Sequence, residues 1–135
     1  MSEGQVVVLD PSVGVKWSKP HEVGSDRALA LLASHRDRTI RIVVPSHFLN
    51  EVLGTAVRHG GPAFGAAVWQ NLQAADLTVV GLDDTLATAV FDQCRLLGCS
   101  FYDALAPALA TLLGATLCSA DARAHASFPG VMLVG

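Results

Sequence analysis

Four acidic residues stand where apolar segments meet the starts of expected helices, and these positions could hold a metal ion. They are Asp10, Glu51, Asp103 and Asp121. Carboxylates at the ends of buried strands have little structural use, whereas carboxylate oxygens are the ligands that Mg²⁺ prefers in proteins. Bound divalent ions can position a water molecule for attack on a phosphodiester. The pattern therefore indicates metal-dependent hydrolysis of a phosphodiester.

Each of these carboxylates also has a purely structural interpretation. Asp10 and Asp121 could cap the helices that follow them. Asp103 could be the capping partner of Ser100, and Glu51 could be a solvated helix residue. A metal site therefore requires a fold that brings all four carboxylates to one edge.

Two serines lie close to these aspartates in the sequence and have two interpretations. Ser12 and Ser119 each lie two residues from an aspartate, Asp10 and Asp121 respectively. They could orient the carboxylates or bond to water at the metal, or they could serve only the turns and helix starts. The five histidines form no HxH or HExxH pattern, so none is assigned a catalytic role.

Clustering of the four carboxylates would have an electrostatic consequence. Like charges in one pocket repel each other, so without a metal ion some carboxyl groups should keep their protons at raised pKa values. A bound divalent ion would reverse this shift. The pKa values therefore test whether the carboxylates are clustered.

Short apolar runs alternate with helix-like segments along the chain. Strands are expected at residues 5–9, 41–44, 77–80, 116–119 and 131–134. Helices are expected from Pro11 and from about residue 120, and at 25–36, 46–59, 62–74, 83–97 and 100–113. Such alternation predicts an α/β sandwich around a mostly parallel sheet. Ligands bind such folds beyond the carboxyl ends of the strands, which is where the acidic residues are expected.

Length, composition and charge limit the classes of protein to consider. The chain has 135 residues, 51% of them hydrophobic and 16% charged, which suits one domain with a normal core. Its net charge of −3 argues against broad binding to duplex nucleic acid, which usually needs a basic surface. No apolar run approaches the roughly 18 to 20 residues that span a bilayer, and the first residues lack the basic region of a signal peptide. We therefore expect a cytoplasmic protein that does not contact a membrane.

Four sequence segments carry the acidic residues in a recognisable order. They are VVLDPSVGVKW, PSHFLNEV, SFYDALAPALA and LCSADARA. Together they resemble the PIN-domain family, and most of all the VapC-type ribonuclease toxins of prokaryotic toxin–antitoxin pairs. The resemblance covers residues 1–135 as a single domain. Two positions depart from the family pattern: Pro107 is expected to kink the helix after Asp103, and Ser119 replaces the usual threonine.

The resemblance implies a three-layer α/β/α sandwich with a mostly parallel five-stranded sheet. It implies an Mg²⁺ or Mn²⁺ site formed by Asp10, Glu51, Asp103 and Asp121, and cleavage of RNA by metal-activated water. It also implies a homodimer and a small VapB-type antitoxin as partner.

Two other functions stay open: a PIN nuclease in RNA processing, and a protein-binding module with little catalysis. The Ala- and Leu-rich helices between residues 25 and 72 would suit the binding module, because they could form an apolar groove for a partner helix. A pure binding module, however, need not keep all four acidic residues.

Overall fold

The computed structural model describes residues 4–135, which contain a five-stranded sheet with the strand order β3-β2-β1-β4-β5. The strands are β1 (Gln5–Leu9), β2 (Ile40–Pro45), β3 (Thr78–Val80), β4 (Thr116–Ser119) and β5 (Met132–Leu133). All four neighbouring pairs run parallel. The predicted α/β fold with a five-stranded sheet is confirmed, and the sheet is parallel throughout.

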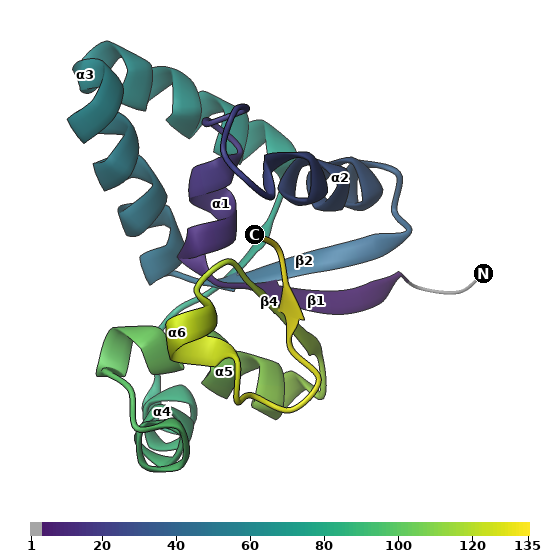
Figure 1. The fold of residues 1–135 in the computed structure, drawn as a ribbon, viewed down its shortest axis with the longest axis vertical. Helices are drawn as coiled ribbons and strands as arrows, with labels where there is room; N and C mark the ends of the chain where they lie inside the picture. Colours follow the sequence, from purple (N-terminus) through teal and green to yellow (C-terminus); the bar gives the residue numbers. More distant parts are fainter. Residues whose placement is uncertain (1–3) are drawn as a thin grey trace.

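Helices cover both faces of this sheet, as Figure 1 shows. One face carries α1 (Pro11–Lys16), α2 (Ser25–Arg36) and α3 (His47–Ala75). The other face carries α4 (Asp84–Leu97) and α5 (Phe101–Leu113), with the short α6 (Ala122–His125) next to α5. The arrangement is the expected three-layer sandwich.

The central strand β1 contributes to two separate hydrophobic cores. Val7 and Leu9 pack in the core beneath α1, α2 and α3, whereas Val8 packs in the core beneath α4 and α5. Successive side chains of a strand point to opposite faces, so a strand covered on both sides must be apolar at every position. This requirement explains the uninterrupted Val-Val-Val-Leu run before Asp10.

The long helix α3 is broken in its middle, where the sequence predicted two helices. Gly61 has φ 81° and ψ 175°, and Pro62 follows it. Glycine adopts a positive φ without strain, and proline fits the first turn of a new helical segment. The two halves of α3 therefore run in different directions (Figure 1).

The helix α5 continues through Pro107 to Leu113, so the proline does not interrupt it. Proline inside a helix removes the hydrogen bond to the carbonyl four residues earlier. For Pro107 that carbonyl belongs to Asp103, and it has a different partner, described below.

No single helix within residues 4–135 is both long enough and apolar enough to cross a membrane. Only α4 and α5 taken together have the length and composition of a span, and they meet at a bend of 110°.

Candidate functional site

A cavity of about 240 Å³ lies at the carboxyl edge of the sheet and contains three of the four predicted carboxylates. Asp10 follows β1, Glu51 lies in the second turn of α3, and Asp103 lies in the first turn of α5. The polar lining is completed by Ser12, His47 and Tyr102.

The parallel topology explains why these residues meet. Strands β1 and β2 are neighbours that run in the same direction, so the segments that follow them emerge at the same edge of the sheet. Asp10 is the first residue after β1, and α3 begins with His47 two residues after the end of β2. Glu51 follows His47 at a spacing of four, which places both on one face of the helix.

Asp121 does not line this cavity. Its carboxylate accepts a hydrogen bond from the Ala124 N–H at 3.2 Å and so caps α6. Its own N–H donates to the Ser119 hydroxyl at 3.0 Å. The side chain of Asp121 therefore has the capping role that was the structural alternative.

Ser12 fixes one oxygen of Asp10 and connects it to the strand β4 region. Its hydroxyl donates to Asp10 Oδ2 at 2.6 Å and accepts a bond from the Ala120 N–H at 2.9 Å. The Ser12 N–H also donates to Oδ2, at 3.1 Å. The other oxygen, Oδ1, makes no hydrogen bond within residues 4–135, and His125 Nε2 lies 3.9 Å from it. Asp10 therefore keeps one carboxylate oxygen available for a cation.

A buried histidine that no sequence pattern marked joins the elements around the site. His125 is fully buried, and its Nε2 lies 2.6 Å from the carbonyl oxygen of Asp103. A carbonyl only accepts, so Nε2 carries the hydrogen, and in the neutral ring Nδ1 accepts from the Ser119 hydroxyl at 2.7 Å. His125 thus ties the start of α5 to the end of β4.

This contact compensates for Pro107. Because proline has no N–H, α5 supplies no donor from position 107 to the Asp103 carbonyl. His125 supplies a donor to that carbonyl instead, so the backbone at Asp103 stays satisfied. Pro107, which departs from the family pattern, and His125 therefore act as a pair at the Asp103 carbonyl near the start of α5.

Replacing His125 with phenylalanine is expected to lower the free energy of unfolding by about 2–4 kcal/mol, because two buried polar groups lose their partner. Urea denaturation measures the change. In a Pro107→Ala background the helix regains a donor for the Asp103 carbonyl, so the same replacement should cost about 1 kcal/mol less. Equal costs in the two backgrounds would show that Pro107 and His125 are not coupled.

His47 is the second histidine at the site, and its Nδ1 is buried without a hydrogen-bond partner in residues 4–135. Burial lowers the pKa of His47, although the charges of Asp10, Glu51 and Asp103 oppose this shift. The ring is therefore neutral near pH 7. A buried nitrogen without a partner in a polar cavity indicates that water or a bound group completes its hydrogen bonding.

The pKa of Asp10 is raised above its usual value, as clustering of carboxylates predicted, but the cause is different. Burial raises the pKa, since only 7% of the residue is exposed, while the hydrogen bonds from Ser12 oppose the rise, as do His125 and His47 when their rings are protonated. Desolvation favours the neutral acid when no cation is nearby. A divalent ion would therefore have its strongest effect on this carboxylate.

This shift has a consequence for stability that depends on pH. Because the folded-state pKa of Asp10 lies above the unfolded value, ionisation destabilises the folded protein as the pH rises through the folded pKa. Asp10→Asn should therefore raise the free energy of unfolding at pH 7 in EDTA, and the gain should shrink as the pH falls toward 4. Urea denaturation at both pH values tests this. A variant less stable than wild type at pH 7 would contradict it.

The donor set of the cavity fits a hard divalent cation that keeps part of its water shell. Three carboxylates face one polar space, and Asp10 Oδ1 and the carboxylates of Glu51 and Asp103 make no hydrogen bond within residues 4–135. Nowhere in residues 4–135 do three His, Cys, Asp or Glu side chains lie close enough together to enclose an ion directly. Mg²⁺ usually keeps several waters and takes only one or two carboxylates directly. Carboxylates spaced too widely to enclose an ion directly therefore suit Mg²⁺.

Two helical spacings could have pointed to the missed histidines. His47 lies four residues before Glu51, and His125 lies four residues after Asp121. Each spacing puts a histidine on the same helix face as an acidic residue. A search for HxH or HExxH patterns does not find such His–carboxylate pairs.

Comparison with known families gives one match that spans most of the chain. The model of the PIN domain matches residues 7–128. No curated protein matches the sequence.

Solved structures with the same fold are similar over nearly their whole length. VapBC2 from Rickettsia felis, bound to a DNA fragment from its promoter, has a TM-score of 0.71 at 16% identity, covering 96% of this chain and 97% of the other. VapC20 from Mycobacterium tuberculosis, a sarcin–ricin loop cleaving toxin, has a TM-score of 0.70 at 17% identity, covering 93% and 98%. A toxin–antitoxin complex from Klebsiella pneumoniae has a TM-score of 0.71 at 14% identity, covering 96% and 98%. At these identities the similarity shows a common fold.

Proposed function

The chain belongs to the PIN-domain family, and from that premise we propose that it is a divalent-metal-dependent endoribonuclease, the toxin of a VapBC-type toxin–antitoxin pair. The observation that carries the proposal is that Asp10, Glu51 and Asp103 line one cavity, where Asp10 Oδ1 and the carboxylates of Glu51 and Asp103 make no hydrogen bond within residues 4–135. On this proposal residues 1–135 form one PIN domain that acts on RNA in the cytoplasm.

The roles of the residues follow from their contacts. Asp10, Glu51 and Asp103 would hold Mg²⁺ or Mn²⁺ at the cavity, and Asp121 would contribute through water. When bound, the ion neutralises charge on the phosphodiester and activates water for hydrolysis. Ser12 fixes Asp10 Oδ2 and leaves Oδ1 free. His125 and Ser119 hold the ends of α5 and β4 that position Asp103 and Asp121.

The cleavage products distinguish attack on the phosphodiester by water from attack by the ribose 2′-hydroxyl. Attack by water leaves a 5′-phosphate and a 3′-hydroxyl. Attack by the 2′-hydroxyl leaves a 2′,3′-cyclic phosphate and needs a general base, for which the neutral His47 is the candidate in the cavity. Mass spectrometry of the fragment ends separates the two routes.

Two apolar surfaces support the proposed protein partners. One is a small hollow of about 30 Å³ between α1 and the two halves of α3, lined in part by Val15, Val52, Ala56 and Phe64. The other comprises exposed residues of α4 and α5, among them Leu96, which is 76% exposed. A homodimer and a small VapB-type antitoxin would each cover apolar surface of this kind.

The first experiment is cleavage by the purified chain, free of any partner, on structured and unstructured RNA with Mg²⁺, Mn²⁺ or EDTA. Cleavage that requires metal and leaves 5′-phosphate ends would support the nuclease. Absence of both cleavage and metal binding would favour the protein-binding module instead. The toxin and the RNA-processing nuclease differ in regulation: only the toxin should lose activity when a small antitoxin is bound.

A further inference from the structure

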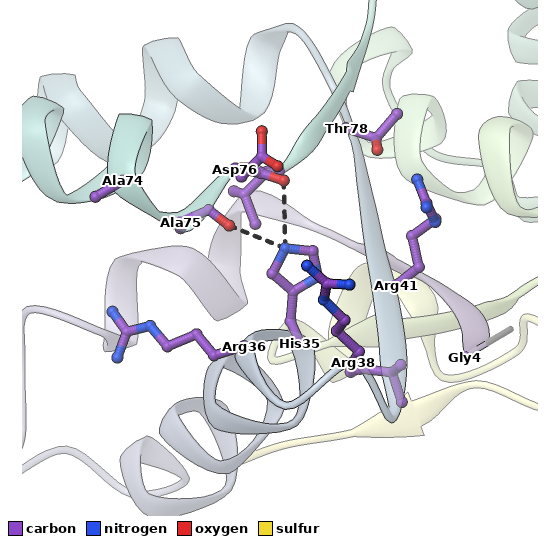
Figure 2. A pocket seen from close by; sticks show the side chains of 11 residues that line it. Gly4, His35, Arg36, Arg38, Arg41, Ala74, Ala75, Asp76 and Thr78 are labelled. Atoms are coloured by element: carbon purple, nitrogen blue, oxygen red, sulfur yellow. Dashed lines mark hydrogen bonds between the residues drawn. The ribbon is translucent and has the colours of Figure 1, made fainter.

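A second hollow, of about 760 Å³, opens at the amino edge of the sheet, opposite to the carboxylate cavity. It lies between the ends of α2 and α3 and the starts of β1, β2 and β3, and Figure 2 shows it from close by. The polar side chains of its lining are those of His35, Arg36, Arg38, Arg41, Asp76 and Thr78. None of the residues that line the carboxylate cavity lines this hollow.

The hollow carries a positive charge although the chain as a whole has a net charge of −3. Arg36, Arg38 and Arg41 contribute three positive charges against the single carboxylate of Asp76. Within residues 4–135 none of these arginines forms an ion pair, whereas other basic side chains, such as Lys16 and Arg95, do. Three of the six arginines that form no ion pair within residues 4–135 therefore line this one hollow.

The backbone at this hollow is strained in a way that favours glycine. Arg38 has φ 64° and Asp76 has φ 55°, and they are the only residues other than glycine with positive φ in residues 4–135. Both lie at helix ends, where α4 and α5 instead have Gly98 and Gly114. Residues other than glycine in this conformation cost free energy and cluster at functional sites, where the side chain has a role. Arg38 thus places a charged side chain at a position where glycine would be free of strain.

His35 gives the hollow a rigid floor. Its Nδ1 accepts a hydrogen bond from the Ile42 N–H at 3.1 Å, and its Nε2 donates to the Ala75 carbonyl at 2.9 Å. With one nitrogen accepting and the other donating, the ring is neutral and ties α2 to β2. Figure 2 shows its bond to the end of α3. These hydrogen bonds hold together the elements that carry the arginines and the end of α3.

We propose that this hollow binds a run of closely spaced phosphate groups, as in an RNA strand or an inorganic polyphosphate. Guanidinium groups match phosphate oxygens through paired N–H donors. Figure 2 shows Arg36 extending to the side of the hollow away from Arg41, so the groups frame the space and do not converge on one point. That spread suits several phosphates in a row better than a single one. The site does not depend on the nuclease proposal.

The test uses the two positions with positive φ, Arg38 and Asp76, because glycine is expected to stabilise the fold at both. Arg38→Gly removes a guanidinium and relieves the left-handed strain, so Tm should rise by about 2–5 °C. The affinity of Arg38→Gly for a fluorescent single-stranded RNA in EDTA should fall about tenfold. The slope of log affinity against log salt should become less negative by about 0.7, because one phosphate contact is lost. Asp76→Gly relieves the same strain but removes the negative charge, so RNA should bind more tightly.

Arg95→Gln is the control for net charge, since Arg95 lies on α4 and pairs with Asp92. It should bind RNA almost as wild type does. Inorganic triphosphate, titrated against the same variants, separates the sources: weakening of both ligands supports a general polyphosphate site, and weakening of RNA alone supports the RNA strand. The proposal is overturned if Arg38→Gly binds both ligands with the affinity and salt dependence of wild type. Since no metal is present, failure of the nuclease proposal leaves this result unaffected.

Discussion

Replacing Asp103 with asparagine is expected to reduce metal-dependent RNA cleavage by about 10³-fold while leaving the fold intact. The carboxylate lines the cavity, so its charge is lost where a divalent ion would need it. The structural contacts of this residue are made by its backbone: the N–H donates to Ser100 Oγ at 3.1 Å, and the carbonyl accepts from His125. Asparagine keeps both contacts, which is why stability should change little. Initial cleavage rates at saturating Mg²⁺ give the effect.

A matched control is Asp84→Asn. Asp84 also lies in the first turn of a helix, α4, but it is exposed and does not line the cavity. The Asp84→Asn variant should cleave RNA at the wild-type rate, which would show that loss of one negative charge is not sufficient to reduce cleavage. Binding of Mn²⁺, followed by electron paramagnetic resonance, should weaken in Asp103→Asn and not in Asp84→Asn. Cleavage by Asp103→Asn at a rate near wild type would remove Asp103 from the proposed mechanism.

The sequence predicted those features of the fold that depend on neighbouring residues. The strand at 116–119 and the helix at 25–36 have the expected bounds, because their apolar runs end at clear breaks. The break in α3 was expected from the Gly60-Gly61-Pro62 segment, since glycine permits the positive φ and proline cannot continue the first helix. The meeting of three carboxylates followed from parallel strands sharing a carboxyl edge.

Other features could not be predicted, because they depend on contacts between residues distant in sequence. The Ser12 hydroxyl accepts from Ala120, 108 residues away, and His125 bonds to the Asp103 carbonyl, 22 residues away. Only the assembled fold shows that His125 supplies the donor that Pro107 lacks. Likewise, burial and not mutual repulsion raises the pKa of Asp10, and burial is a property of the packed molecule.

The packing of α1 against α3 supports the site from the other side, and its central residue is Phe48. The ring is fully buried and lies in edge contact with Trp17 at a centroid distance of 5.7 Å. It also packs directly on α1: a Cβ added at Gly14 would come within 2.8 Å of Phe48 Cε2 and of Val52 Cγ2. Glycine is therefore required at position 14 for the two helices to approach this closely.

Phe48→Ala is expected to lower the free energy of unfolding by about 3–5 kcal/mol, because it removes buried apolar surface and leaves a cavity beside a rigid contact. Urea denaturation measures the loss, and Phe91→Ala, at a ring that is half exposed on α4, should cost less than about 1 kcal/mol. α1 begins directly after Asp10 and α3 carries Glu51, so loosening this contact should also weaken Mn²⁺ binding at temperatures where the variant remains folded. Unchanged Mn²⁺ affinity in the folded variant would mean that the carboxylates are positioned by the strand ends alone.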